Sequence, residues 1–329
     1  MQVPSIQGGE HRRQTGERDE SNGADWGHAA EWIWQGHRCH WRVLGDPAAA
    51  AVVLVHGFGA GSGHWRRNAA VLAEAGWCVY GLDLIGFGAS SQPAHNPRHR
   101  LDNRFWARQL QGFLQQVVGR HAVIVGHSLG GLVALSCSVF FPDWVRAVVA
   151  APLPDPALLM ASERQGLLAP RRPPWQRRLQ QLVVSGLCRL LPLELIVPLL
   201  AHSPLLDLGI QSAYHQPVIG DGELHRLIAR PARRPGAVRA LRAMSIGMGL
   251  RPHGATAPAL LQRLRIPLLL VWGQQDRLVP LEVARQILRQ RHDLPLVVLD
   301  GAGHCPHDEA PQLFNSTVLD WIKRQPNPG

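Results

Sequence analysis

Short apolar runs that alternate with helical patterns constrain the fold of this chain more than any other feature. Residues 50–55, 122–125 and 267–272 are continuous apolar stretches, which suit strands buried on both faces of a parallel sheet. Further strands are predicted at 31–37, 39–44, 77–82, 145–150 and 296–299. Helices are predicted at 64–75, 103–118, 129–141, 281–290 and 311–323. This alternation predicts an α/β fold with a mostly parallel central sheet and flanking helices.

The alternation of strands and helices stops in the middle of the chain. Residues 152–258 are rich in Pro, Arg and Leu and predict only helices, so we interpret them as a helical lid inserted into the fold. The core is then formed by residues 29–151 and 259–329. Residues 1–28 are polar and rich in Gly, Glu and Arg, which predicts a disordered tail.

The charge of the chain bears on its partners. The sequence holds 34 Lys and Arg against 24 Asp and Glu, a net charge of +10. No basic stripe with interleaved aromatic residues is present, so we expect no nucleic-acid partner. Residues 151–255 hold 13 Arg and 6 acidic residues, a local excess of 7, with one group at Arg171, Arg172, Arg177 and Arg178. Such a region attracts an anionic membrane surface or an acidic substrate, although a solvated basic face is the alternative.

Cysteines and apolar segments indicate the cellular setting. The five cysteines are scattered and form no CxxC pair, which favours reduced thiols over a disulfide framework or a zinc site. The first residues lack the apolar stretch of a secretory signal. The most apolar segment, residues 182–200, is interrupted by charged residues and prolines, so no transmembrane helix is expected. We therefore expect a cytoplasmic protein that can associate peripherally with a membrane.

The pentapeptide Gly126-His127-Ser128-Leu129-Gly130 is the strongest chemical signal. A G-x-S-x-G pattern is weak by itself, but this one lies between a predicted apolar strand and a predicted apolar helix, which is the context of a nucleophile elbow. The glycines are needed because the turn is tight. The elbow raises the Ser128 hydroxyl above the sheet edge, at the positive end of the following helix. We predict that Ser128 is a nucleophile; the alternative is a plain glycine-rich turn.

A serine hydroxyl needs a neighbouring base to accept its proton. His304 stands in the loop directly after the last predicted strand, from where it can reach over the elbow, and we favour it as the base. His307 is the alternative, although it is expected to begin the last helix and to be structural. No other ligand cluster accompanies these two histidines in the sequence, so a metal site is not expected there.

The acid that orients the base should follow an earlier strand. Asp276 comes just past the strand at 267–272 and gives the chain order Ser, Asp, His that accompanies a nucleophile elbow. Asp155 is the alternative, although it stands between two prolines in what is more simply a turn. Asp300 is also near His304 but is expected to cap a turn.

The oxyanion that forms during acyl transfer needs hydrogen-bond donors. One candidate is the backbone amide of Leu129, which follows the nucleophile. The other is the amide of Phe58 in the turn His56-Gly57-Phe58-Gly59. Only the main chain is required for this role, and the Phe58 ring can also line the pocket. Such a set of groups needs no metal and no organic cofactor.

These signals, in this order, resemble the α/β-hydrolase superfamily, and the resemblance spans residues 30–325. The segments VHGFGA (55–60), HWRRN (64–68), DLIGFGAS (83–90) and GHCPHDE (303–309) are similar to the pheophytinase and chlorophyll-dephytylase-like branch of plants and cyanobacteria. Residues 214–230 also resemble that branch, whose members tend to carry Asn where this chain has His127. The resemblance implies an α/β-hydrolase fold with a lid, and cleavage of the phytyl ester of a chlorophyll-type pigment.

Two functions of different classes follow. The first is a lidded serine hydrolase that cleaves a carboxylic ester of a lipophilic, phytyl-type substrate, with Ser128 attacking, His304 moving the proton and Asp276 holding the imidazole. An epoxide hydrolase or dehalogenase of this fold would carry Asp at position 128. The second is a pigment-handling or chelatase-accessory protein that binds on the same fold without turnover.

Overall fold

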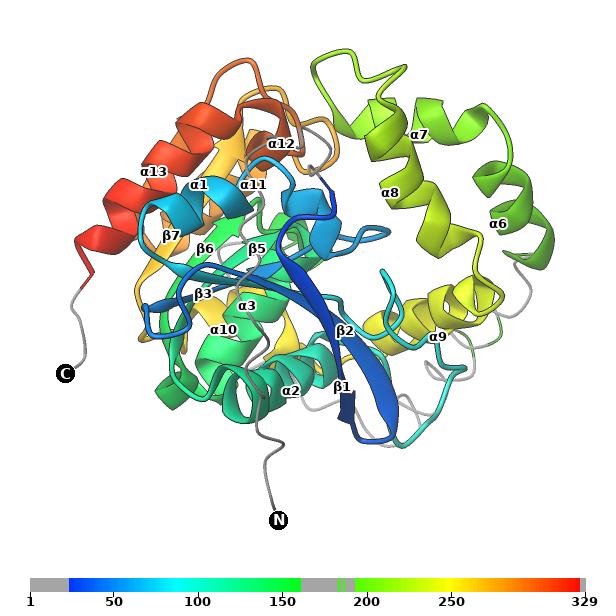
Figure 1. Ribbon diagram of the computed structural model, residues 1–329, viewed down its shortest axis with the longest axis horizontal. Helices are drawn as coiled ribbons and strands as arrows, with labels where there is room; N and C mark the ends of the chain where they lie inside the picture. Colours follow the sequence, from blue (N-terminus) through cyan, green and yellow to red (C-terminus); the bar gives the residue numbers. More distant parts are fainter. Residues whose placement is uncertain (1–23, 161–182, 184–185, 187–192, 326–329) are drawn as a thin grey trace, which may run out of the picture.

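The computed structural model describes residues 24–160, 183, 186 and 193–325, which form an eight-stranded sheet with helices on both faces (Figure 1). The strand order is β1-β2-β4-β3-β5-β6-β7-β8. β2 pairs antiparallel with β1 and β4, whereas all other neighbours are parallel, so the predicted mostly parallel sheet is confirmed. The strands are β1 His28–Trp34, β2 His37–Leu44, β3 Ala51–Val55, β4 Cys78–Leu82, β5 Ala122–His127, β6 Val145–Ala151, β7 Leu268–Gly273 and β8 Leu296–Leu299.

Helices cover both faces of the sheet and enclose two separate apolar cores. The larger core lies under α2, α3, α10 and α11, and the smaller one lies under α1 and α13. These helices are α1 Ala69–Glu74, α2 Asn103–Phe113, α3 Leu129–Phe140, α10 Ala257–Leu261, α11 Leu281–Gln290 and α13 Pro311–Lys323. Two short helices, α4 Pro156–Met160 and α12 Pro306–Glu309, follow β6 and β8 in the chain. The flanking helices predicted from the sequence are therefore present on both sides.

Strand β3 shows how an uninterrupted apolar run produces two cores. Ala51, Val53 and Val55 face the larger core. Val52 and Leu54 face the smaller one. Successive side chains of a strand point to opposite faces, so a strand that is covered on both sides must be apolar at every position. All five side chains are at most 3% exposed.

Between β6 and β7 the described residues form helices and no strand, as predicted. Four of these helices, which we call the helical insert, lie beyond the edge of the sheet, at the right of Figure 1. They are α6 Leu193–Ala201, α7 Leu205–Ala213, α8 Gly222–Ala232 and α9 Ala237–Gly249. Their role as a lid stays a prediction.

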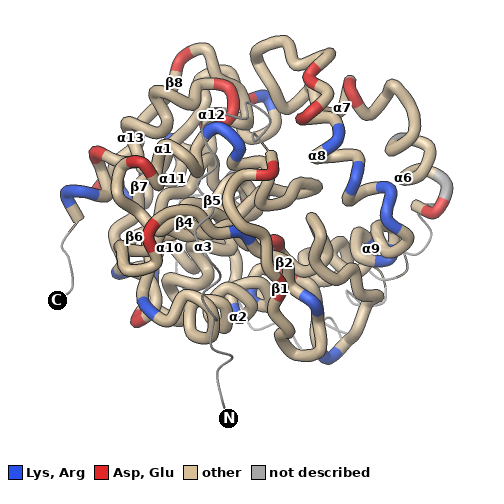
Figure 2. Tube along the Cα trace, in the orientation of Figure 1, with Lys and Arg blue, Asp and Glu red and all other residues tan. Residues whose placement is uncertain are grey.

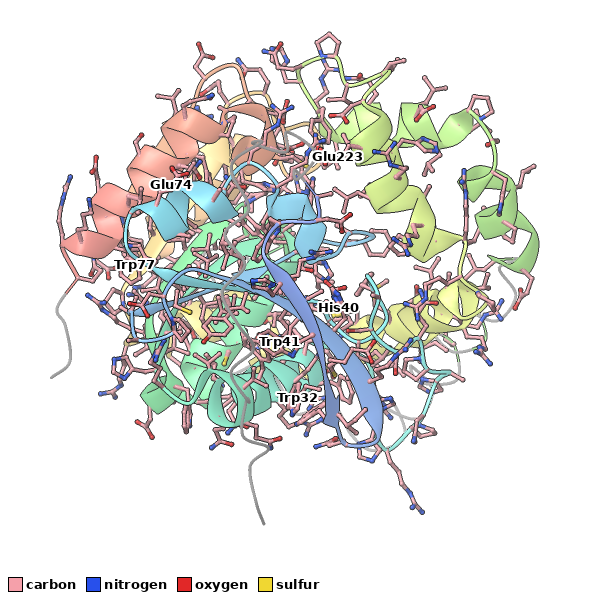
Figure 3. The ribbon with its side chains drawn as sticks, in the orientation of Figure 1. Trp32, His40, Trp41, Glu74, Trp77 and Glu223 are labelled. Carbon is pink, nitrogen blue, oxygen red and sulfur yellow. The ribbon has the colours of Figure 1, made fainter. Side chains whose placement is uncertain are left out.

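Arg66 anchors the helical insert to the core. Its guanidinium, on a side chain that is 3% exposed, donates to the carboxylates of Asp221 and Glu223 at the start of α8. It also donates to Asp308 in α12. Figure 3 shows Glu223 where the start of α8 meets the core. Burial by itself would lower the pKa of Arg66, but the hydrogen bonds to these carboxylates raise it, so the cation is fixed at the junction.

The predicted boundary of the N-terminal tail at residue 28 is wrong, because residues 24–28 belong to the folded chain. Trp26 is 3% exposed and packs into the smaller core. Its indole N–H donates to the Ser62 carbonyl at 3.0 Å. Gly81 in β4 leaves room for this ring, since a Cβ at that position would lie 2.6 Å from it. A large aromatic side chain with a satisfied N–H thus ties residues 24–28 to the sheet.

Two predicted helices are interrupted. The helix expected at 64–75 is split into a 3-10 turn, Ser62–Trp65, and α1. The break lies at Asn68, whose buried amide donates to the His307 carbonyl and to the Asn315 side chain. The helix expected at 103–118 becomes a π-helical turn, Leu114–Val118, after α2.

The described residues contain no helix that is long and apolar enough to cross a bilayer. The cysteines among them (Cys39, Cys78, Cys137 and Cys305) are buried and free, and Cys188 lies outside the described residues. Most of the apolar segment 182–200 also lies outside them, apart from α6 at its end.

Candidate active site

Ser128 stands at the sharp turn between β5 and α3, with φ +50° and ψ −116°. A positive φ is unusual for a residue with a side chain, and a strained turn of this kind is what a nucleophile elbow requires. Gly126 and Gly130 permit the turn: a Cβ at either position would collide with a backbone carbonyl, that of Gly130 in the first case and that of Val55 in the second. The glycines of the pentapeptide are therefore explained by close backbone approach.

The structure brings Ser128, His304 and Asp276 into one hydrogen-bonded chain. His304 Nε2 lies 2.9 Å from Ser128 Oγ, and His304 Nδ1 lies 2.9 Å from Asp276 Oδ2. A carboxylate can only accept, so the proton of the neutral ring is on Nδ1, and Nε2 carries the lone pair that accepts the serine hydroxyl. The three residues are 6–8% exposed. This arrangement can deprotonate Ser128 as it attacks.

Asp276 is held in place from its own turn. Its Oδ1 accepts the backbone amides of Leu278 and Val279, each at 2.8 Å, which leaves Oδ2 free for His304. The two amides fix the orientation of the carboxylate at the carboxyl end of β7. The acid is thereby pre-positioned toward the imidazole before any substrate arrives.

The loop that carries His304 is fixed on three sides. The Glu309 carboxylate accepts the amides of Gly303 and Cys305 at 2.8 and 3.2 Å. The His304 amide donates to the Ala213 carbonyl at the end of α7, at 2.9 Å. The His304 carbonyl accepts His127 Nε2–H at 3.0 Å. The backbone of His304 is thus tied to the helical insert and to the elbow at once.

The alternative acids do not reach His304. Asp155 is buried and accepts from the Arg251 guanidinium and from the Ala257 amide at 2.6 Å, so it joins the segment after β6 to the start of α10. Asp300 is exposed and accepts from the Gln275 side chain at 2.8 Å. Both therefore hold turns, and Asp276 is the carboxylate that the fold presents to the imidazole.

The candidate oxyanion donors lie in the turn after β3 and at the start of α3. A Cβ on Gly57 would lie 3.3 Å from Ser128 Cβ, so this turn sits directly beside the serine. The Leu129 amide opens α3, where the first amides of a helix have no carbonyl one turn back to which they can donate. Among the described residues the Phe58 amide has no hydrogen-bond partner either. The Phe58 ring is 57% exposed and packs edge-on against Phe87.

A cleft of about 1050 Å³ separates the core from α8. Arginines line it from both sides, along α8 and from β2, as the blue segments of Figure 2 show for α8. They are Arg38, Arg42, Arg226, Arg230, Arg233 and Arg234. Ser128, His304 and Asp276 are not among its lining residues, but Gly61, close to the oxyanion turn, is. The cleft is therefore a basic surface beside the candidate site.

Sequence reasoning missed the groups that support the site. Glu309, Arg66 and Tyr214 all lie in segments that resemble the pheophytinase-like branch. The neighbouring residues in the sequence do not indicate which groups these side chains contact. The sequence offers His307 as an alternative base, predicts a structural role for it and indicates no metal site there. His307 is fully buried in α12, and neither of its ring nitrogens has a hydrogen-bond partner among the described residues. Its ring packs against those of His64 and His127. The contacts of these groups span up to about 240 positions of the chain.

The fold and this chain of hydrogen-bonded side chains define the class of protein. Residues 52–317 match the sequence model of the Alpha/beta hydrolase family, and the chain belongs to that family.

Individual relatives have low sequence identity to this chain, but the matches extend over most of its length. Chloroplastic pheophytinase of Arabidopsis thaliana is 24% identical, over 93% of this chain and 69% of the relative. The human (lyso)-N-acylphosphatidylethanolamine lipase is 27% identical, over 84% of this chain and 81% of the relative. Among solved structures, 2-hydroxy-6-oxo-6-phenylhexa-2,4-dienoate hydrolase from Rhodococcus sp. strain RHA1 is 27% identical with a TM-score of 0.64, covering 90% of this chain and 99% of that one. Hydrolase activity is the feature that these relatives share by name.

Proposed function

We propose that this protein is a serine hydrolase that cleaves a carboxylic ester of a lipophilic, phytyl-type alcohol. The observation that carries the proposal is the chain Ser128–His304–Asp276, in which each donor faces an acceptor at 2.9 Å. A nucleophile, a base and an orienting acid in this order are the groups that acyl transfer requires. A protein that only binds a ligand has no need of them.

In the proposed reaction, Ser128 Oγ attacks the ester carbonyl while His304 Nε2 takes its proton. The amides of Phe58 and Leu129 donate to the oxyanion, and Asp276 stabilises the imidazolium that forms. His304 then gives the proton to the departing alcohol, and the acyl group stays on Ser128. Water, deprotonated by His304, attacks the acyl-enzyme and releases the acid. These side chains and backbone amides, with water, are sufficient for both the acylation and the deacylation steps of the proposed reaction.

A lipophilic substrate is supported by exposed apolar side chains on the helical insert. Leu199 in α6, Leu205 and Leu208 in α7 and Ile219 just beyond are each at least half exposed. Phe58 at the oxyanion turn is exposed to a similar degree. We take these exposed apolar side chains as contacts for an apolar partner. The names of the two curated relatives, a pheophytinase and a lipase, agree with this class of substrate.

A panel of esters, combined with a fluorophosphonate probe, tests the reaction. The probe should label the wild type but not Ser128→Ala, because it reacts only with an activated serine. Chlorophyll a, pheophytin a, an N-acylphosphatidylethanolamine and p-nitrophenyl esters of rising chain length should be compared by chromatography or absorbance. Turnover is expected to rise with the length of the apolar group, and a phytyl ester should be cleaved.

The pigment-binding alternative makes the opposite prediction. It expects tight binding of pheophytin or chlorophyll, no labelling of Ser128 and no ester turnover. Labelling of Ser128 together with turnover of short esters only would retain the mechanism and remove the phytyl-type substrate.

We further propose that the protein works at the surface of a membrane, as a peripheral protein. The exposed leucines of α6 and α7 supply apolar contact with lipid. Arg226 and Arg230, which line the cleft beside α8, are exposed and form no ion pair with any described residue. Basic groups near an anionic bilayer contribute about 1 kcal/mol each, and salt screens them. Arg171, Arg172, Arg177 and Arg178 lie outside the described residues.

The double variant Leu205→Asn/Leu208→Asn should bind anionic vesicles at least about tenfold more weakly, because two side chains that are 50% and 59% exposed lose their transfer into lipid. Co-sedimentation with phosphatidylglycerol-containing vesicles measures this. Wild-type binding should also weaken between low and physiological salt.

Leu313→Asn is the matched control, since Leu313 is 56% exposed on α13, on the far side of the core from α6. It should bind vesicles like the wild type, and all variants should hydrolyse a short soluble ester equally. Equal vesicle binding by the wild type and the two variants would contradict the membrane proposal. It would have no bearing on the proposed roles of Ser128, His304 and Asp276.

A further inference from the structure

Three buried histidines meet directly behind the candidate triad. His64, His127 and His307 each offer a ring nitrogen within 4.8 Å of the others. The rings of His307 and His127 have centroids 4.4 Å apart, and those of His307 and His64 are 4.6 Å apart. All three residues are at most 4% exposed. The proposed mechanism uses none of these rings.

The hydrogen bond of His127 fixes where its proton is. Nε2 faces the His304 carbonyl, which can only accept, so Nε2 carries the hydrogen. In the neutral ring Nδ1 then bears a lone pair, and this nitrogen is buried without a partner. Gly57 leaves it uncovered, because a Cβ at position 57 would lie 2.5 Å from Nδ1. His127 therefore presents a bare lone pair inside the protein.

The same reasoning applies to His64. Its Nε2 lies 2.8 Å from the Tyr214 hydroxyl, and that hydroxyl gives its single hydrogen to the Asp308 carboxylate at 3.0 Å. Tyr214 must then accept from His64, so Nε2 of His64 carries the hydrogen and Nδ1 the lone pair. This Nδ1 is also buried without a partner.

His307 completes the set, since both of its ring nitrogens are buried and unpartnered. Burial lowers the pKa of His64 to about 4 and the pKa values of His127 and His307 well below the usual range, so the three rings are neutral at pH 7. The neutral imidazole is the form that binds metal. The cluster thus holds three lone pairs and a single free N–H, an excess of acceptors that a cation or a buried water can satisfy.

We propose that His64, His127 and His307 form a binding site for one divalent first-row transition ion of the Zn²⁺ type. Three histidines are a ligand set that zinc accepts, with water at the fourth position. The outer hydrogen bonds are those expected of metal-bound histidines: His127 donates to a backbone carbonyl, and His64 reaches the Asp308 carboxylate through Tyr214.

To bind a zinc ion, the three ring nitrogens must move closer together. Zinc holds imidazole nitrogens at about 2.0–2.1 Å, which sets neighbouring nitrogens about 3.4 Å apart in a tetrahedral site. The widest pair, within 4.8 Å here, therefore closes by up to about 1.4 Å. Because the site is enclosed, the ion enters while the chain folds or during local opening.

The position of the site gives the ion a structural role. His64 follows the oxyanion turn, His127 precedes the nucleophile and His307 follows the base by three residues. One ion would link the three segments that carry the proposed catalytic groups. Metal binding here would tighten the site without touching the substrate.

The metal content of the full chain tests the proposal without any turnover assay. The protein should be produced with added zinc, and again after removal of metal with dipicolinate and reloading during refolding. Bound zinc should reach one equivalent per chain by plasma mass spectrometry. Cobalt in place of zinc should show the intense visible bands of a tetrahedral site. Zinc should also raise the melting temperature of the stripped protein.

His127→Asn is the sharpest variant, because its amide N–H can still donate to the His304 carbonyl while the ring nitrogen is lost. It should weaken zinc binding by more than about 100-fold, the upper end of what losing an outer hydrogen bond does. His307→Phe keeps the aromatic packing against Trp65 and serves if the first variant does not fold. His292→Asn changes an exposed histidine and should bind zinc like the wild type.

Two results would overturn the site. One is zinc well below stoichiometry in both preparations, which would show that the histidines hold a water or stay unpaired. The other is zinc binding that His127→Asn and His307→Phe leave unchanged, which would place the metal on surface histidines. Neither result bears on whether Ser128 reacts with the fluorophosphonate probe.

Discussion

Ser128→Ala is expected to lower kcat/KM for any cleaved ester by about 10⁴- to 10⁶-fold, as removal of a triad nucleophile does elsewhere. The substitution removes the hydroxyl oxygen that lies 2.9 Å from His304 Nε2. Alanine leaves the backbone and the neighbouring glycines as they are, so the variant should fold. Steady-state hydrolysis of a p-nitrophenyl ester measures the loss, and thermal melting checks the fold.

A residual rate above that in water is expected, because the amides of Phe58 and Leu129, the proposed oxyanion donors, stay in place. Gly57 offers no side chain that could replace the hydroxyl. Activity retained within about tenfold would remove Ser128 from the mechanism and with it the proposed function.

His304→Ala should lower kcat/KM about as much as Ser128→Ala, since members of a triad act as a unit. The double variant Ser128→Ala/His304→Ala should be no worse than either single one. In the proposed mechanism His304 Nε2 acts through Ser128 Oγ, which lies 2.9 Å away, while Asp276 holds the other ring nitrogen. Parallel kinetics of the three variants measure this non-additivity.

His307→Ala distinguishes the two histidines that the sequence left in competition. His307 is fully buried and contacts no triad atom through a hydrogen bond, so its loss should chiefly lower the melting temperature by opening a cavity. The loss of kcat/KM should be far smaller than for His304→Ala when both are assayed well below the melting temperature. The reverse order would show that the base is three residues further along the chain.

Much of the core was predictable because its signals are local. An apolar run such as β3 indicates a strand covered on both faces, and the glycines of the elbow indicate a turn in which backbones approach closely. The chain order Ser128, Asp276, His304 pointed to the residues that the structure places in hydrogen-bond contact.

The predictions that failed depended on contacts with distant parts of the chain. The pattern at 64–75 is helical, but the Asn68 side chain donates a buried hydrogen bond to the His307 carbonyl, and the helix breaks there. Trp26 looked like part of a polar tail, yet a space left by Gly81 receives its ring. In both cases a buried hydrogen bond outweighed the conformation that the local sequence favours, which is a continuous helix at Asn68 and a disordered tail at Trp26.

The sequence by itself determined the strands, most of the core helices and the elbow, because side-chain periodicity and backbone sterics act over a few residues. Only the tertiary structure decided how Arg66 joins the insert to the core, and that His64, His127 and His307 meet. Those three histidines are separated by 63 and 180 positions, and nothing in the spacing of the residues indicates that they touch. The sheet brings them together because β3 and β5 are parallel neighbours whose carboxyl ends lie at the same edge as the loop after β8.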